Sequence, residues 1–353
     1  GTPTGTVTFD FGDGTPAVTA PLTGGTATVD HAYADPSDTP YTVTATYSGD
    51  TLFVPSSGTD TQTVGEAATT STVTSAPDPS QPGQPVTVVA HVAPLAPGAG
   101  APTGTVTFDF GDGSPGTVLP LSGGAATVDH TYTDVGGSPY TITATYSGDT
   151  DFTGSSGTDT QTVEQAATTT GLDLAPNPSV VGQQVTATAT VTAVPPSAGT
   201  PTGTVTFDFG DGSPATTVPL TGGAAGATHT YTGTAGSPYQ VTATYNGDTN
   251  FTPSTATGGQ AVGQAHTTTA VVSAPDPSAT GEEVTFTATV TAVAPGAGTP
   301  TGTVTFDFGN GGPTTTVPLT GGAATATHAY ADTATYPVTR HLQRRHRLHH
   351  LER

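Results

Sequence analysis

The sequence PTGTVTFDFG occurs four times in this chain, and its spacing constrains the fold more than any other feature. It starts at Pro3, Pro102, Pro201 and Pro300, so the period is 99 residues each time. Histidine keeps the same period, at His31, His130, His229 and His328. Because a period of this length is the size of a small domain, we expect like units arranged in tandem.

The second copy alternates apolar and polar residues over short runs, as half-buried β-strands do. In residues 104–110, for example, Val106, Phe108 and Phe110 fall on one face. The strands expected are 69–74, 85–93, 104–110, 116–121, 125–132, 140–146 and 157–163. Seven strands in one period match an immunoglobulin-like sandwich. We therefore predict an all-β fold of tandem immunoglobulin-like β-sandwiches, about seven strands each, in an extended array.

The period divides the chain into four units, which we call repeats 1 to 4. Their expected bounds are 1–64, 65–164, 165–263 and 264–339. We expect repeat 1 to be truncated at its N-terminal side and repeat 4 to be incomplete, so the sequence is interpreted as a fragment. Residues 340–353 resemble none of the repeats.

Charge excludes several classes of function for residues 1–339. The chain has 27 Asp and Glu against 5 Lys and Arg, a net charge of −22, and all five cations lie in residues 340–353. A surface without cations repels phosphate backbones and anionic lipid, so we exclude nucleic acid as a partner. Without cysteine there is no disulfide or thiolate chemistry. No apolar stretch approaches the ~18 residues that a membrane span needs.

The basic tail, 340–353, has two interpretations. One is a basic arm that binds nucleic acid. The other is a frameshift, because one nucleotide sequence encodes RHLQRRHRLHHLER in one frame and ATYNGDTDFTTSSG in the next. The second peptide matches residues 144–157 at 12 of 14 positions. We therefore interpret the tail as frameshifted, by a sequencing error or a mutation, and expect repeat 4 to lack its last strands.

Several motifs resemble the bacterial Ig-like repeat domains found in tandem in large secreted and surface proteins. These motifs are APNPSVVGQQVTATATV (175–191), PTGTVTF (201–207) and YQVTATYNGDTNF (239–251). FDFGDGSP (207–214) and THTY (228–231) are similar to the polycystic-kidney-disease (PKD) type of Ig-like domain. The resemblance implies an extracellular or cell-surface location in a bacterium, and no catalytic residues.

These observations favour a non-enzymatic spacer, or stalk, or an adhesin repeat region whose partners are the neighbouring repeats of the same chain. The alternative is a module that binds a carbohydrate or glycoprotein, such as a cell-wall or host glycan, through inter-strand loops. The Pro/Ala/Gly segments at 93–102 and 193–201 are such loops, but they have no aromatic or charged residue to hold a sugar ring.

The GDG motif, at 12–14, 111–113 and 210–212, could be a carboxylate metal loop or a hairpin turn. The fourth copy reads GNG (309–311), which keeps the turn and loses the charge. We therefore interpret it as a tight turn in which Asp-Gly supplies the positive φ angles.

The recurring histidine could belong to a catalytic Asp–His pair, since His31 and His130 follow Asp30 and Asp129. Such a pair needs a nucleophile within reach, and no nucleophile motif is present. The histidine also shares a strand face with tyrosine, so we expect a hydrogen-bonded core residue. His91 is expected on a solvent-facing strand position.

Calcium is the remaining candidate ligand, because it prefers oxygen donors. Asp149, Asp151 and Asp248 lie in SGDTDF (147–152) and NGDTNF (246–251). Position 52 is Leu and position 250 is Asn, so the donors change between repeats. We favour a polar turn anchored by Phe152, and otherwise predict no catalytic, cofactor or metal site.

Overall fold

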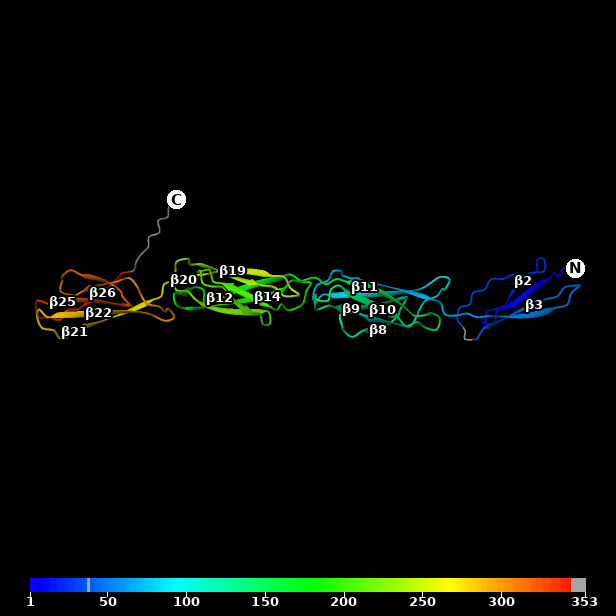
Figure 1. Ribbon diagram of the computed structural model, residues 1–353, viewed down its shortest axis with the longest axis horizontal. Coiled ribbons are helices and arrows are strands. Elements are labelled where there is room, and N and C mark those ends of the chain that lie inside the picture. Colours follow the sequence, from blue (N-terminus) through cyan, green and yellow to red (C-terminus); the bar gives the residue numbers. More distant parts are fainter. Residues whose placement is uncertain (37–38, 344–353) are drawn as a thin grey trace, which may run out of the picture. The chain divides into compact units, whose positions relative to one another are not determined.

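The computed structural model describes residues 1–36 and 39–343, and every regular element in them is a β-strand. The all-β prediction is therefore confirmed. The chain divides into two compact units. Figure 1 labels strands of both units. Unit 1 comprises Gly1–Ala166 and Val194–Gly199, and unit 2 comprises Ala167–Ala193 and Thr200–Arg353. Each unit is described by itself.

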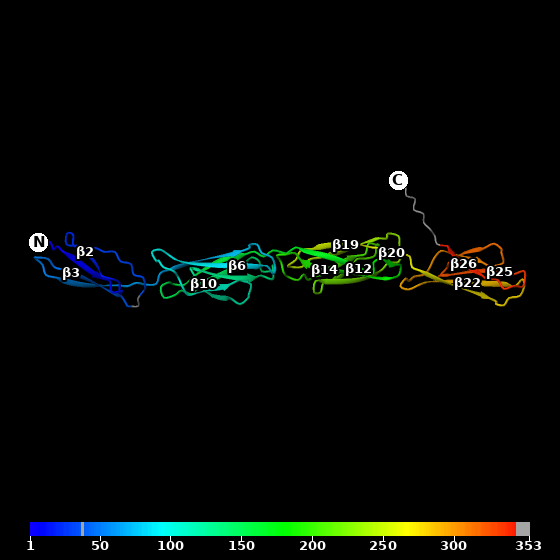
Figure 2. The ribbon, with the colours of Figure 1, turned by 180° about the vertical axis from the view of Figure 1, so that it is seen from behind.

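Repeat 2, in unit 1, has the seven strands expected, in two antiparallel sheets. The three-stranded sheet has the order β5-β6-β9, with β5 at Thr69–Ala76, β6 at Pro85–Pro94 and β9 at Ala125–Thr131. The four-stranded sheet has the order β11-β10-β7-β8, with β11 at Ser155–Gln161, β10 at Tyr140–Tyr146, β7 at Thr105–Asp109 and β8 at Thr117–Pro120. Figure 2 labels β6 and β10, one strand from each sheet, from behind.

The alternating positions of repeat 2 form its core. Val86, Val88 and Phe108 are 0% exposed and belong to one cluster of buried residues. Their polar neighbours point outward, and His91 is exposed as expected. Tyr132 and Tyr146 are also fully buried in this cluster. The two sheets therefore pack face to face, as in an immunoglobulin-like sandwich.

Repeat 1, also in unit 1, has a single sheet of order β2-β1-β3-β4. Its strands are β1 at Thr6–Asp10, β2 at Val18–Pro21, β3 at Tyr41–Tyr47 and β4 at Ser56–Gln62. Within the described residues, 27–32 form no strand, although the same stretch of repeat 2 is β9. Phe9 is consequently half-buried where Phe108 is fully buried. Leu52 and Val54 are more than 80% exposed.

The strands of repeat 3 all lie in unit 2 and form the same two-sheet arrangement. One sheet has the order β12-β14-β17, with β12 at Thr168–Ala175, β14 at Gln184–Ala193 and β17 at Ala224–Thr230. The other has the order β16-β15-β18-β19, with β16 at Thr216–Pro219, β15 at Thr204–Asp208, β18 at Tyr239–Tyr245 and β19 at Ser254–Gln260. Two short parallel strands, β13 (Ser179–Val180) and β20 (Val262–Gly263), close the edge between the sheets.

Repeat 4, also in unit 2, has two three-stranded sheets and a core cluster of its own. The first has the order β21-β22-β25, with β21 at Thr267–Ala274, β22 at Glu283–Ala292 and β25 at Ala323–Ala329. The second has the order β24-β23-β26, with β24 at Thr315–Pro318, β23 at Thr303–Asp307 and β26 at Thr339–Gln343.

Strand β26 differs from the expectation that the last strands of repeat 4 are lost. It pairs with β23 in the position that β10 and β18 occupy in repeats 2 and 3. Strand pairing is made by backbone groups, so the unrelated tail sequence can still pair. No strand corresponding to β11 follows it within the described residues. The rest of the tail, 344–353, lies outside them.

Candidate functional site

The recurring histidine lies in a cluster with an acid and two aromatic rings. In repeat 2, Nε2 of His130 donates to Oδ2 of Asp112 over 2.7 Å. The imidazole stacks on Phe110 with 3.8 Å between ring centroids and meets Tyr132 edge-on at 4.7 Å. The side chains of His130 and Asp112 are only 15% and 17% exposed. The expected hydrogen-bonded histidine is thus present, and its acidic partner is Asp112 of the GDG motif.

The alternation of β9 explains the geometry of the cluster. His130 and Tyr132 are two positions apart, so both side chains point to the same side. Phe110 and Asp112 come from the connection between β7 and β8, which spans residues 110–116. Asp129, which precedes the histidine, points the other way and accepts a hydrogen bond from Thr87.

The same cluster occurs in repeats 1 and 3, with Asp13–His31 at 2.7 Å and Asp211–His229 at 2.8 Å. In repeat 4, Nδ2 of Asn310 donates to Nε2 of His328 over 2.8 Å. An amide donor fits only a neutral ring with a free nitrogen lone pair, whereas a carboxylate accepts from a neutral or a protonated ring. The acid at this position is therefore not needed for the fold of the cluster.

The hydrogen-bond order in the cluster does not suit nucleophilic catalysis. Ser114 Oγ and His130 Nε2 both donate to Asp112, so the acid lies between the hydroxyl and the imidazole. A catalytic triad instead places the histidine between the two, where it can take the proton of the nucleophile. In repeat 3, burial alone would raise the pKa of Asp211, but hydrogen bonds from Ser213 and His229 hold it at about 2. The arrangement can fasten a loop.

The GDG motif is a longer connection than the tight turn that we expected. Gly111 and Gly113 have φ of +74° and +81°, whereas no residue other than glycine has positive φ in the part of the chain that the structure describes. Asp112 therefore does not supply a left-handed conformation, and its role is to accept the hydrogen bonds of the cluster. The strands on either side, β7 and β8, are paired as in a hairpin.

The calcium candidates lie in a second recurring loop. Oδ2 of Asp149 accepts from the backbone and the hydroxyl of Thr103, both at 2.6 Å. Its Oδ1 accepts from the backbone amides of Asp151 and Phe152. Burial opposes ionisation of Asp149, but these hydrogen bonds outweigh it and hold the pKa at about 2. The carboxylate thus fastens the loop to Thr103, two residues before β7.

Asp248 makes the same contacts in repeat 3, with Thr202, Asn250 and Phe251. Asp50 makes them in repeat 1, with Thr4, Leu52 and Phe53. The described residues hold no group of three His, Cys, Asp or Glu side chains that could bind a metal ion. We favoured a polar turn over a calcium site in these loops, and that interpretation stays a prediction, with Asp149, Asp151 and Asp248 as the alternative calcium candidates.

Two buried glutamines were missed in the sequence. Gln161 and Gln260 are 0% exposed at the ends of β11 and β19. Nε2 of Gln161 donates to the carbonyl oxygens of Pro77 at 2.9 Å and Thr162 at 3.0 Å. Gln260 does the same with Pro176 and Ala261. The two glutamines are 99 residues apart, so their recurrence could be read from the sequence. Their burial could not, because polar residues at strand ends are usually exposed.

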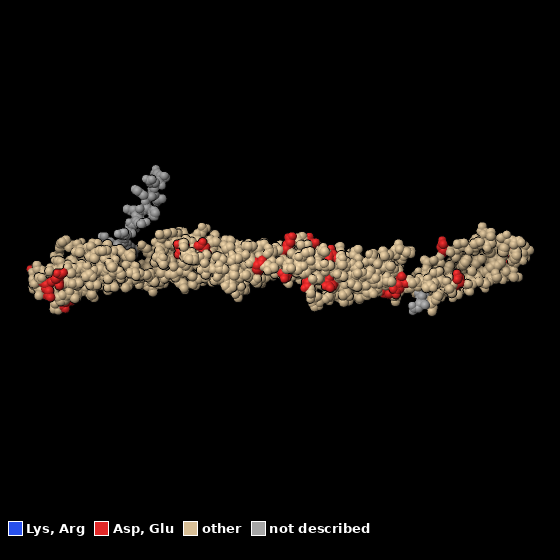
Figure 3. Space-filling view, in the orientation of Figure 1, with Lys and Arg blue, Asp and Glu red and all other residues tan. Residues whose placement is uncertain are grey.

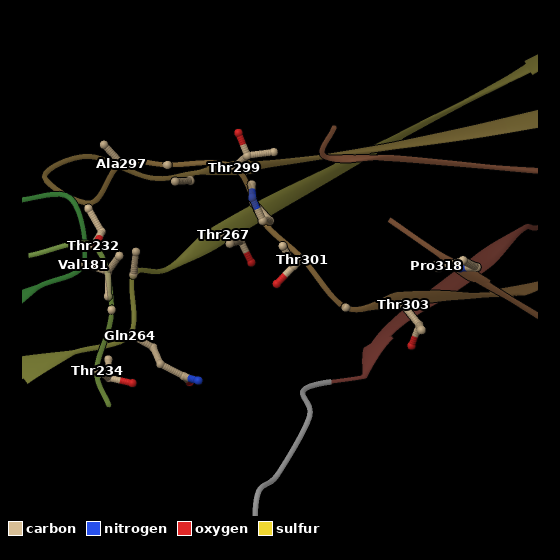
Figure 4. Close-up of a pocket in the computed structure, with 16 residues that line it drawn as sticks. Val181, Thr232, Thr234, Gln264, Thr267, Ala297, Thr299, Thr301, Thr303 and Pro318 are labelled. Carbon is tan, nitrogen blue, oxygen red and sulfur yellow. The ribbon is translucent and has the colours of Figure 1, made fainter. Parts of the chain in front are cut away.

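Acidic side chains are spread thinly over the face of the molecule in Figure 3, and the larger pocket is lined by uncharged residues. Figure 3 shows small groups of acidic side chains separated by uncharged surface. In unit 2, a pocket of about 750 Å³ is lined by Thr, Gly, Ala, Pro and Val with Gln264 (Figure 4). Threonines from repeat 3 (Thr232, Thr234) and repeat 4 (Thr299, Thr301) are among the residues that line it. Among the described residues there is also no helix that could span a membrane.

Several solved structures resemble the chain in fold. One is a tetra-tandem repeat in the extending region of a large adhesion protein, with 14% identity, 96% of this chain and 90% of that chain covered, and a TM-score of 0.35. Another is the Escherichia coli adhesin FdeC, with 14% identity, coverage of 77% and 92%, and a TM-score of 0.25. A third is a three-domain segment of titin, with 13% identity, coverage of 73% and 88%, and a TM-score of 0.33.

No curated protein matches the sequence. The sequence model of the bacterial Ig-like domain (group 3) matches residues 73–164 and 172–269, which together are more than half of the chain. These two segments contain most of repeats 2 and 3, whose two-sheet sandwiches and recurring His–Asp clusters are described above. The chain belongs to the family of bacterial Ig-like domains of group 3.

Proposed function

We propose that this chain is a non-enzymatic spacer or adhesion repeat region of a bacterial secreted or cell-surface protein. The four repeats, bounded as 1–64, 65–164, 165–263 and 264–339, would be its successive domains. Its partners would be neighbouring repeats of the same chain. We also propose that the FDFGDG and HTY motifs relate these repeats to PKD-type Ig-like domains.

One observation carries the proposal: the recurring polar groups are used for internal hydrogen bonds. The carboxylate of Asp112 accepts from Ser114 and His130, and that of Asp149 accepts from Thr103 and its own loop. The Nε2 group of Gln161 donates to backbone carbonyl oxygens. Side chains bound in this way hold loops in place and are not available to a substrate. A domain of this kind supports its neighbours mechanically.

A mechanical role is tested by pulling the chain from its two ends in a single-molecule force measurement. Repeats 2 and 3 should each give a separate force peak, because each has two packed sheets. Each peak should release up to about 35 nm of chain, because the 99 residues of a repeat span roughly 3.5 Å each when extended. Smooth extension without peaks would contradict the proposal.

A second candidate function is binding of a neutral glycan in the pocket of unit 2. The threonine hydroxyls and Gln264 that line it are the observation in its favour, because neutral polar groups suit sugar hydroxyls. The pocket has no aromatic residue, on which a sugar ring could stack.

A glycan array separates the two functions. Saturable binding by the chain that is lost in a Thr232→Val, Thr301→Val double variant would establish the second candidate. A matched control is Thr188→Val, which changes an exposed threonine of β14 outside the pocket. No signal above the control would leave the spacer as the function.

A further inference from the structure

A glycine turn in repeat 3 is in contact with a loop of repeat 4, within unit 2. The turn follows β13 and is closed by a hydrogen bond from Gln183 N to Val180 O over 3.0 Å. The loop connects β22 to β23. Its Ala297 N donates to Val181 O over 3.1 Å, and Figure 4 shows Ala297 next to Val181. A backbone hydrogen bond thus joins consecutive repeats.

Glycine is required at the centre of this turn for two reasons. Gly182 has φ of +80°, a left-handed conformation that other residues adopt only with strain. A Cβ atom added to Gly182 would also lie 2.6 Å from Cα of Ala297, and closer still to its backbone N and O. The backbone of the loop therefore occupies the space that any side chain at position 182 would need.

A related contact occurs in unit 1, between the turn at Gly83 and the segment Val194–Gly199, where a side-chain hydroxyl makes the hydrogen bond. Gly83 also has φ of +80°. Ser197, which is 6% exposed, donates from Oγ to Pro82 O over 2.6 Å. A Cβ atom on Gly83 would lie 3.0 Å from Gly199 N and 3.1 Å from Ala198 N. The clash would be milder here than at Gly182.

Repeat 4 contains the same turn without the contact, so it is a natural control. Gly281 has φ of +79° and donates to Tyr330 O over 2.8 Å. Gly182 donates in the same way to Tyr231 O over 2.9 Å. No atom lies within 4 Å of a Cβ added to Gly281. The backbone conformation of the turn is thus common to the repeats, and the docked loop is what differs.

We propose that the glycine turn of each repeat is a docking site for the Pro/Ala/Gly loop of the next repeat. Residues 295–298 (PGAG) dock at Gly182, and residues 195–199 (PPSAG) dock at Gly83. The two loops lack charged and aromatic side chains, which made them poor candidates for holding a sugar ring and suits them to this close backbone contact. Small residues let two backbones approach closely. The inference deepens the proposed spacer function and rests on it for its biological role.

The test compares Gly182→Ala with Gly281→Ala in the full chain. Both variants place alanine at the same strained φ, and only the first adds a clash with a docked loop. The chain has no cysteine, so spin labels can be attached to Thr188→Cys in β14 and Thr289→Cys in β22, both at exposed positions. Gly182→Ala should broaden the distance distribution between the labels, and Gly281→Ala should leave it unchanged.

Amide exchange gives an independent readout. In Gly182→Ala, exchange of the Ala297 amide should accelerate roughly tenfold, the loss expected for one hydrogen bond. If Gly182→Ala unfolds repeat 3, Ala297→Pro removes the donor without changing the turn, and the label distribution should broaden.

Equal label distributions in the parent, Gly182→Ala and Ala297→Pro would overturn the docking site. They would leave the force peaks of repeats 2 and 3 in place, so the spacer proposal would survive. If the force peaks are lost and the distance distribution between the labels stays narrow in the parent and broadens in the variants, the spacer proposal fails and the docking site survives.

Discussion

At the scale of single residues, the histidine of each repeat shows a reactive residue type used for packing. His130 is held between Phe110, Tyr132 and Asp112, and its ring donates to a carboxylate that also accepts from Ser114. The ionised acid matters here because two donors converge on it. Repeat 4 keeps the ring contacts with Asn310 in place of the acid.

The acid should make repeat 3 sensitive to low pH. The pKa of Asp211 is lowered from 3.8 to about 2 in the folded chain. A group whose folded pKa is lowered contributes stability above its ordinary pKa and loses it as pH falls toward the folded pKa. Between pH 4 and pH 2, repeat 3 should therefore lose stability. Asp211→Asn should reduce this loss of stability between pH 4 and pH 2. The measurement is urea unfolding of repeat 3 at a series of pH values, monitored by hydrogen exchange.

The converse substitution is the control. Asn310→Asp copies the acid of the other repeats into repeat 4 and should introduce a loss of stability between pH 4 and pH 2. If the dependence of stability on pH between pH 4 and pH 2 is unchanged in both variants, the His–Asp contact is absent in solution.

The buried glutamines should contribute measurably to stability. Gln161→Ala removes a buried donor from the carbonyl oxygens of Pro77 and Thr162, of which Thr162 O also accepts from Ser80 N, and we expect a loss of about 1–3 kcal/mol. Gln62→Ala is the matched control, because Gln62 occupies the same place in repeat 1 and is exposed. Denaturant midpoints of the two variants measure the difference, and equal losses would contradict the role of burial.

At the scale of strands and sheets, the same sequence has different surroundings in different repeats. Strand β1 and strand β7 both read TVTFD. In repeat 2 a second sheet covers β7, whereas the described part of repeat 1 has only the sheet that contains β1. Burial of a strand face is therefore a property of the partner sheet, not of the strand.

Phe108→Ala should cost repeat 2 about 3–5 kcal/mol, the range for removing a fully buried phenylalanine. Phe9→Ala should cost repeat 1 distinctly less, because Phe9 is only half-buried. Hydrogen exchange of β7 and β1, read separately by mass spectrometry, measures both. A loss in repeat 1 as large as that in repeat 2 would mean that the face of β1 is covered in solution.

At the scale of the whole molecule, the cores of repeats 2 and 4 are separate clusters with no residue in common. Stability in tandem repeats is approximately a sum over units and their contacts with neighbours. A change deep in one core should therefore stay local.

Phe108→Ala should leave the stability of repeat 4 within about 0.5 kcal/mol of the parent, because distant substitutions are additive. The measurement is hydrogen exchange of β22 and β25 in the variant and the parent. A matching loss of protection in repeat 4 would show that the repeats unfold as one unit.

The sequence by itself determined the repeat period, the strands and the faces that form the core. Alternation in residues 85–93 predicted β6, and its buried positions Val86 and Val88 followed from the period of two. These features are local, since a strand face is encoded by neighbours in the chain. The Gly-Asp-Gly connection was predicted only in part. Positive φ at its glycines is a local property, whereas the contact of Asp112 with His130 depends on a strand that follows later in the chain.

Tertiary structure alone decided which residues meet across the sandwich. Asp112 reaches His130, Gln161 reaches Pro77, and Ala297 reaches Val181 over long stretches of chain. The pairing of β26 with β23 was likewise not visible in a tail whose sequence resembles no repeat. Such contacts depend on how sheets and repeats pack in space, and sequence periodicity shows which residues recur without showing what they touch.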